Sequence, residues 1–142
     1  PIFQLLGTNY SQRQIITRLD DDKNLFDAFT KISFVYPHAV ASMKVGQGVK
    51  SEGELIISGT KGYIYVPAPW WKTDYFEIRY ENPANNKRYF YQLDGEGIRY
   101  ELVSFVKAVQ TRRPYSYINT EVSEAIVETI NDFYAQRDLI II

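Results

Sequence analysis

The chain contains no cysteine among its 142 residues, which excludes disulfide bridges, thiolate metal sites and cysteine nucleophiles. Its formal net charge is −1, from 16 basic and 17 acidic residues. It therefore lacks the basic excess that favours binding to nucleic acid or to an anionic membrane surface. No apolar run reaches the length of a membrane-spanning helix, so we expect no membrane insertion. A protein without disulfides fits a cytoplasmic location, which we expect here.

Aromatic residues, in contrast, are plentiful. They make up 15% of the chain, with 12 tyrosines, 8 phenylalanines and 2 tryptophans. Many of the tyrosines fall in segments where apolar and polar residues alternate, the pattern of a half-buried strand. These segments predict a broad antiparallel sheet with an aromatic face. That face either packs within the domain or contacts another subunit or a sugar.

The strand-like segments precede the helix-like ones. Segment 53–66 predicts a β-hairpin whose corner is Gly59-Thr60-Lys61-Gly62, because glycine permits the positive φ of tight turns. Pro37 and His38 mark another corner, since proline cannot donate to a central ladder. The other predicted strands cover residues 14–19, 25–36, 39–45, 76–80 and 88–93.

The apolar period then changes from two to about 3.6 residues, which predicts two amphipathic helices. The first carries its stripe on Ile98, Leu102, Phe105, Val106 and Val109, and ends before Pro114. The second starts at Asn119 or Thr120, either of which can cap it. Its expected buried stripe consists of Val122, Ile126, Ile130 and Phe133. Residues 1–6 resemble the tail of a further helix, closed by Gly7, so we expect the chain to continue a longer protein.

Strands first and helices last predict an α+β fold: an open-faced, mostly antiparallel sheet with helices packed on one face. We expect residues 1–142 to form a single domain of this kind. One helix layer leaves the other face of the sheet open. We expect that face to be rich in tyrosine and to be a contact surface.

The search for catalytic residues yields little. His38 is the only histidine and lies at a strand corner, where a surface or capping role competes with that of a general base. Asp20-Asp21-Asp22 lacks the longer pattern of a calcium loop and is interpreted as a solvated turn. The glycines at 59–62 and 95–97 lack the spacing or the βαβ context of nucleotide-binding loops. We therefore assign no catalytic, metal-binding or cofactor-binding residue.

The segment Pro69-Trp70-Trp71-Lys72 is the best local candidate for binding. Neighbouring residues of a strand point to opposite faces, so both tryptophans cannot face one core. An exposed indole ring can stack on a sugar or on a partner's side chain, whereas the alternative is packing at the sheet edge. Trp70, Trp71 and Lys72 are the candidate substrate-binding residues. Lys44 and Lys50 are either contacts for an anionic substrate group or solvated residues of the sheet.

Three motifs follow one another in an informative order. They are Gly53-x-Leu-x-Ile-x-Gly59-x-x-Gly62-x-Ile64, then Pro69-Trp-Trp71, then Tyr100-Glu101-x-x-x-Phe105 at the start of a helix, and a final helix containing Ser123 completes the order. Over essentially its whole length the chain thereby resembles the C-terminal domain of the Gfo/Idh/MocA family, named after glucose-fructose oxidoreductase and inositol dehydrogenase.

The resemblance implies one half of an NAD(P)-dependent oxidoreductase. In this family an N-terminal Rossmann domain binds NAD or NADP, and the C-terminal domain holds part of a sugar or cyclitol substrate. The open sheet face of the C-terminal domain commonly mediates homo-oligomerisation. The family's glycine-rich loop, its Glu-Lys-Pro element and its Asp-x-x-x-His element are absent from this sequence. We therefore expect the isolated chain to be inactive and to bind no nicotinamide cofactor tightly.

Two other classes of function remain open from the residues. The chain could be a stand-alone interaction module, in which the open sheet pairs with a second copy or with another protein. It could also be a carbohydrate-binding module that uses the paired tryptophans.

Overall fold

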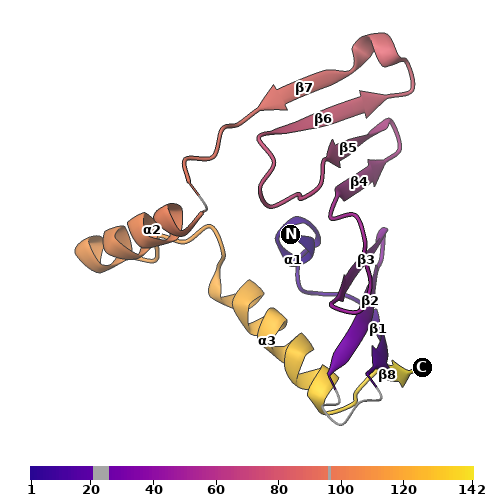
Figure 1. The fold of residues 1–142 in the computed structure, drawn as a ribbon. Helices are drawn as coiled ribbons and strands as arrows, with labels where there is room; N and C mark the ends of the chain where they lie inside the picture. The colour runs from indigo at the N-terminus through magenta and orange to yellow at the C-terminus, as the bar shows by residue number, and fades with distance from the viewer. Residues whose placement is uncertain (21–25, 96) are drawn as a thin grey trace. The chain divides into compact units, whose positions relative to one another are not determined.

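A computed structural model describes residues 1–20, 26–95 and 97–142 (Figure 1). It divides the chain into two compact units, one formed by Pro1–Lys50 with Tyr117–Ile142 and the other by Ser51–Ser116. The turn expected at Asp21 and Asp22 lies outside the described residues. Among those that are described, no helix combines the length and the apolar character needed to cross a membrane.

The first unit is built on a four-stranded sheet with the order β3-β2-β1-β8. Its strands are β1 (Gln12–Leu19), β2 (Asp27–Tyr36), β3 (Ala39–Gly46) and β8 (Leu139–Ile141). The first three are antiparallel neighbours, with the expected turn at Pro37 and His38. The C-terminal strand β8 was not predicted, and it pairs in parallel with β1. Three residues give too short a pattern to be recognised as a strand without its partner.

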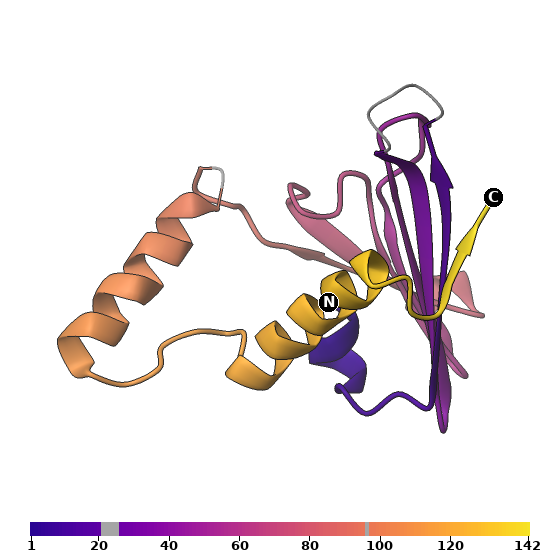
Figure 2. The ribbon, with the colours of Figure 1, turned by 90° about the horizontal axis from the view of Figure 1, so that it is seen from below.

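Two helices, α1 (Ile2–Leu6) and α3 (Thr120–Tyr134), pack against one face of this sheet (Figure 2). The core between them is formed by Phe3, Phe34, Tyr36 and Val122. The rings of Phe3 and Phe34 meet edge to face, with their centroids 5.1 Å apart. The Tyr36 hydroxyl donates a 2.9 Å hydrogen bond to the Gly7 carbonyl oxygen. This arrangement confirms that helices cover one face of a sheet in this part of the chain.

The predicted helix ends are confirmed in detail. Asn119 caps α3, and its side-chain oxygen accepts a 2.8 Å hydrogen bond from the Val122 N–H. Gly7 closes α1 with φ at +81°, and its N–H donates to the Phe3 carbonyl. Each is a local arrangement that the residue type itself favours.

The predicted buried stripe of α3 is wrong in part. Val122 is buried, but Ile126 and Ile130 are exposed, and the helix buries the polar residues Thr129 and Asp132 instead. The physical reason lies on β1, where Arg13 is buried beside Asp132. The ion pair between Arg13 and Asp132 places this one acidic residue of α3 against the sheet.

The second unit holds another four-stranded sheet, antiparallel throughout, with the order β4-β5-β6-β7. Its strands are β4 (Leu55–Gly59), β5 (Gly62–Val66), β6 (Tyr75–Tyr80) and β7 (Lys87–Phe90), with the 3-10 turn η1 (Pro83–Asn85) between the last two. The hairpin of β4 and β5 is confirmed. A Cβ atom at Gly62 would lie 2.5 Å from the Arg79 carbonyl oxygen, so the close approach of β6 requires glycine there.

The helix α2 (Ile98–Thr111) contains the predicted apolar stripe and ends before Pro114 as expected, but it does not have the predicted burial. None of its residues, all of which the structure describes, is buried, and Leu102, Phe105 and Val109 are each more than half exposed. The described chain is thus α+β with two mostly antiparallel open sheets, where one broad sheet was expected. Among the described residues, all of the buried ones lie in the first unit, where Phe3 of α1 and Val122 of α3 pack in the core beside the sheet.

Candidate functional site

The predicted binding segment leaves β5 at Val66 and folds back beside the start of β4. Pro67 and Pro69 end the strand because they cannot donate to a ladder, and the Ala68–Pro69 peptide bond is cis. The Trp70 N–H donates a 2.7 Å hydrogen bond to the Gly53 carbonyl oxygen. The Lys72 N–H donates to the Pro69 carbonyl at 2.9 Å and closes a turn. The segment is therefore held in place by two backbone hydrogen bonds.

Both tryptophans are partly exposed, Trp70 by 37% and Trp71 by 57%. Their rings meet edge to face, with centroids 5.9 Å apart and planes at 88°. Both residues lie in a turn and not in a strand, so the alternation expected of neighbouring strand residues does not apply to them.

Trp71 lines an open groove of about 610 Å³ within the second unit. Its walls combine apolar and polar groups, among them Pro67, Pro69, Trp71, Lys72, Asp74 and Gln92. Trp70 does not line this groove, whereas Trp71 and Lys72 do. Its volume lies within the range of small-molecule clefts. An indole face offers stacking area, and carboxylate and amide groups offer hydrogen bonds to hydroxyl groups.

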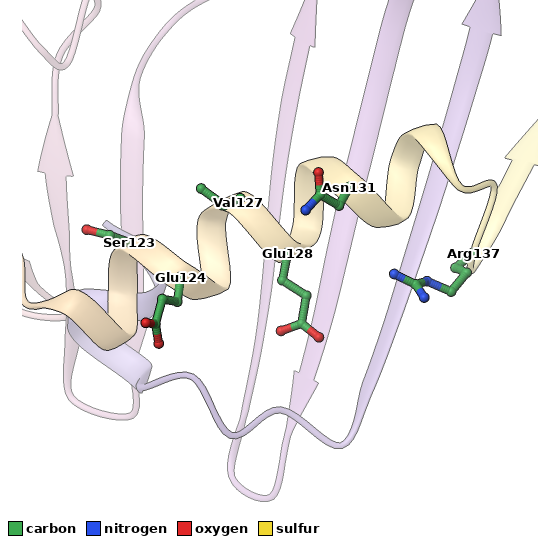
Figure 3. Close-up of a pocket in the computed structure, with 6 residues that line it drawn as sticks. All are labelled: Ser123, Glu124, Val127, Glu128, Asn131 and Arg137. Carbon is green, nitrogen blue, oxygen red and sulfur yellow. The ribbon is translucent and has the colours of Figure 1, made fainter.

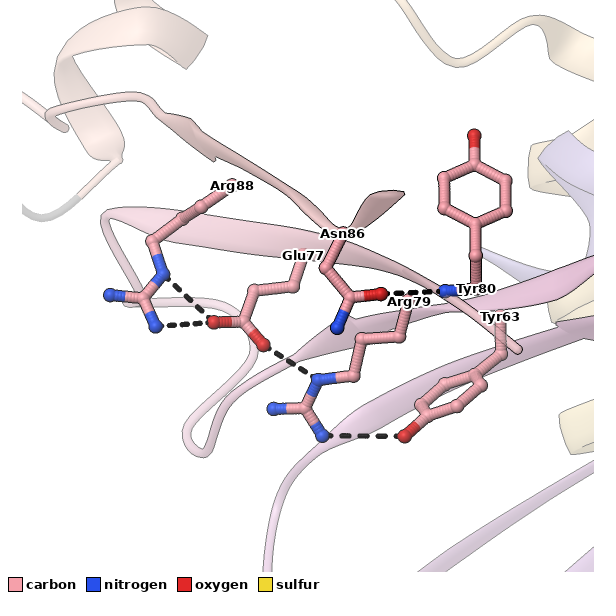
Figure 4. A network of polar contacts seen from close by, with 6 residues as sticks. All are labelled: Tyr63, Glu77, Arg79, Tyr80, Asn86 and Arg88. Carbon is pink, nitrogen blue, oxygen red and sulfur yellow. Dashed lines mark hydrogen bonds and ion pairs between the residues drawn. The ribbon is translucent and has the colours of Figure 1, made fainter. Parts of the chain in front are cut away.

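The sheet of the second unit also carries an aromatic and charged face (Figure 4). The register places one set of side chains on that face: Tyr63, Tyr65, Tyr75, Glu77, Arg79, Arg88 and Phe90. The Arg79 guanidinium lies 4.3 Å from the centroid of the Tyr65 ring, and that of Arg88 lies 4.8 Å from the centroid of Tyr75. We call this set the aromatic–arginine face.

Glu77 is the centre of the aromatic–arginine face. Its carboxylate accepts hydrogen bonds from Arg79 Nε at 2.6 Å and from Arg88 Nε at 2.8 Å. The hydrogen bonds from Arg88 and then from Arg79 hold the pKa of Glu77 below its usual value. Hydrogen bonds to Tyr63 and then to Glu77 raise the pKa of Arg79. The face is thus a fully charged ion network between aromatic rings.

The open face of the first sheet has a different composition. Lys31 and Lys44 lie directly opposite each other there, beside Ser33 and Ser42, and no tyrosine lies on the described part of that face. The expected tyrosine-rich open surface is therefore confined to the second sheet. Lys50 is exposed beyond the end of β3.

The remaining polar candidates do not assemble into a catalytic group. His38 is exposed in the turn between β2 and β3. Glu124 and Glu128 point to the same side of α3, with Arg137 beyond the helix end, around a shallow hollow of about 360 Å³ (Figure 3). The described residues contain no cluster of three or more histidine, aspartate or glutamate side chains that could hold a metal ion.

The two glycine-rich segments take the structures expected of them. Gly59 and Gly62 flank a hairpin turn, and Gly97 precedes α2 with φ at +90°. Glu96, between Gly95 and Gly97, lies outside the described residues. Neither segment links a parallel strand to a helix, as a dinucleotide-binding loop does.

Sequence reasoning missed several groups that the structure brings together. Asp74, just before β6, and Gln92, just after β7, line the groove together at the open end of this hairpin, and neither belongs to a recognisable motif. The alternation of Glu77 and Arg79 predicted a solvated strand face, but the approach of Arg88 depends on the register across the hairpin. No sequence signal pointed to the buried pair of Arg13 and Asp132.

No model of a known protein family matches the chain, and no curated protein matches it either.

Proposed function

We propose that this chain is the substrate-binding and oligomerisation part of an NAD(P)-dependent dehydrogenase of sugars or sugar derivatives. The proposal rests on the order of sequence motifs that resembles the C-terminal domain of the Gfo/Idh/MocA family. The observation that carries it is the groove beside Trp71, where an indole ring, a carboxylate and an amide line one open space. We place this enzyme in the cytoplasm because the chain has no cysteine.

The groove suits a small ring compound that bears several hydroxyl groups. The indole of Trp71 would cover the C–H face of such a ring, while Asp74 and Gln92 would hydrogen-bond to its hydroxyls. Lys72 carries a positive charge at the same wall and would favour a substrate with an anionic substituent. The role of these residues is to fix the position of the reacting carbon, which lowers the entropic part of the barrier.

The cofactor of the proposed enzyme would be bound by a separate Rossmann domain. The described glycine-rich segments form a hairpin turn and a helix lead-in, which do not fit a dinucleotide. When bound by that domain, NAD or NADP would accept or supply the hydride. No residue of this chain is assigned to the transfer itself.

The aromatic–arginine face supports the proposed role in oligomerisation. Tyrosine and arginine are enriched at protein interfaces because each combines a flat apolar surface with hydrogen-bonding atoms. Here they are arranged in rows across the sheet of the second unit. The exposed apolar stripe of α2 gives independent support for a larger assembly, because such stripes are normally covered.

The direct test compares this chain with the full-length gene product. We expect the full-length protein to reduce NAD or NADP in the presence of a sugar or cyclitol from a substrate panel, and this chain alone to be inactive. Trp71→Ala in the full-length protein should raise KM about tenfold or more. Tyr134→Ala serves as a matched control, because Tyr134 is 78% exposed on α3 and does not line the groove. Nicotinamide-dependent turnover by this chain alone would refute the proposal that a separate Rossmann domain binds the cofactor.

A stand-alone interaction module is the second candidate, and the aromatic–arginine face is the observation that favours it. The two proposals predict different coding sequences upstream of this chain. A Rossmann coding segment directly upstream supports the dehydrogenase. Glycan binding by this chain that is lost in Trp71→Ala, without any nicotinamide-linked activity of the gene product, would instead identify a carbohydrate-binding module.

A further inference from the structure

The groove wall formed by Trp71 rests on a residue that bears no side chain. Gly53 lies just before β4, and its carbonyl oxygen accepts the 2.7 Å hydrogen bond from the Trp70 N–H. A Cβ atom at Gly53 would lie 3.2 Å from Cζ3 and 3.3 Å from Cη2 of Trp71. A Cβ atom at position 53 would therefore make a tight contact with the outer edge of the indole, which would have to move by a few tenths of an ångström to admit it.

This contact involves the part of the indole that a smaller ring lacks. Cζ3 and Cη2 are the far carbons of the six-membered ring, and a phenylalanine side chain at the same position would not reach them. The third nearest atom to the added Cβ is the Pro69 Cα at 3.9 Å, an ordinary contact distance. The crowding at Gly53 is thus with one aromatic side chain and not with the backbone.

We propose that Gly53 is a positioning residue that sets the place of the Trp71 indole and thereby determines which rings the groove admits. This inference rests on the proposed function, because it assigns the groove to a sugar-like ligand. Backbone hydrogen bonds anchor the segment on both sides of the indole. A side chain at position 53 therefore displaces the ring against a fixed backbone and changes the shape of the groove wall.

The first test follows the indole itself and needs no ligand. The chain has two tryptophans, so Trp70→Phe leaves Trp71 as the sole fluorescent indole. In that background we expect Gly53→Ala to shift the emission of Trp71 and its quenching by acrylamide, and Gly53→Val to shift both further. Gly48→Ala is the matched control, since its added Cβ would also meet a neighbour at 3.2 Å, the Ala28 Cβ in the other unit. Unchanged Trp71 fluorescence in both Gly53 variants overturns the proposal.

The second test measures binding with D-glucose and myo-inositol as probes, by calorimetry on the full-length protein and on this chain. We expect Gly53→Ala to raise the dissociation constant of the more tightly bound probe about fivefold, an effect within the range of interaction energies between residues in contact. Trp71→Phe, which removes the two crowded carbons, should make a further Gly53→Ala change nearly neutral. This non-additivity separates positioning of the ring from a general loss of stability.

The outcomes distinguish this inference from the proposed function. The positioning role alone is overturned if Gly53→Ala changes probe affinity equally with Trp or Phe at position 71. It is also overturned if Gly53→Ala alters the Trp71 fluorescence but leaves probe affinity unchanged. If neither probe nor any sugar of the substrate panel binds to the unaltered protein, the proposed function fails, and the specificity role of Gly53 fails with it.

Discussion

The Nη2 atom of Arg13 lies 2.5 Å from Oδ2 of Asp132, and the two side chains expose only 4% and 7% of their surface. The pair connects β1 to the last turn of α3. Asp138, just beyond the helix, lies 2.9 Å from the same nitrogen of Arg13, and Arg137 pairs with the other oxygen of Asp132. Four charges thus fix the C-terminal helix on the first sheet, next to the parallel strand β8.

Removal of the central carboxylate should be costly. Asp132→Asn leaves the half-exposed Asp138 as the one acidic partner that the structure describes for the buried Arg13 guanidinium. We expect the free energy of unfolding to fall by about 3 kcal/mol, as for other buried charges that lose one partner. Urea unfolding followed by circular dichroism measures this loss. Glu128→Gln, an exposed change on the same helix, should have little effect, and equal stability of the two variants would contradict a buried ion pair.

The same pair predicts how stability depends on pH. Burial by itself raises the pKa of Asp132, but the hydrogen bonds from Arg13 and Arg137 outweigh it and hold that pKa below its usual value of 3.8. Because the folded-state pKa is the lower one, the stabilisation is complete above the unfolded pKa and is lost as the pH falls through the folded pKa. We expect the contribution of Asp132 to be constant from pH 7 to about pH 5 and to decline below about pH 4.

Unfolding curves recorded between these pH values check this prediction. The difference in stability between the parent chain and Asp132→Asn should narrow as the solution is acidified, because protonation removes the charge that the variant lacks. A difference that stays constant down to the acid unfolding of the parent would show that Asp132 does not act through its charge.

A third prediction concerns the start of α3. Asn119→Ala removes the acceptor of the 2.8 Å hydrogen bond from the Val122 N–H, and Val122 belongs to the core of the first unit. We expect a loss of about 1 kcal/mol in the free energy of unfolding, typical of N-cap residues. Asn131→Ala is the matched control, because Asn131 is exposed within the same helix and alanine favours helix there. A comparable loss in the control would contradict a capping role.

The features that were predicted correctly depend on nearby residues. Asn119 caps a helix that begins at the next residue, and Pro37 breaks a strand where it stands. The alternation of Glu77 and Arg79 with Phe76 and Ile78 identified β6 as a strand, although all of its residues are half-buried and the expected solvated face is not seen. In each case the chemistry of one residue or a short period determines the local structure.

The features that were missed depend on residues far apart in the sequence. Arg13 and Asp138 are separated by 125 positions, so their contact could not be predicted before the pairing of β1 with β8 was known. The apolar pattern of α3 favoured Ile126 and Ile130 as buried residues, but the ion pair decided which side faces the sheet. The contact between Gly53 and Trp71 likewise depends on a backward turn of the chain after β5. Such arrangements follow from tertiary packing, which overrides local preference.

The last prediction tests the aromatic–arginine face as an interface between two copies. Glu77→Lys replaces the carboxylate shared by Arg79 and Arg88 with a third positive charge. If two copies associate through this face, like charges meet across it, and we expect association to weaken by about tenfold or more. Light scattering and sedimentation measure the change over a range of protein concentrations. Lys44→Glu, on the open face of the first sheet, should leave association unchanged. Association that survives Glu77→Lys but fails in Lys44→Glu would place the interface on the first sheet instead.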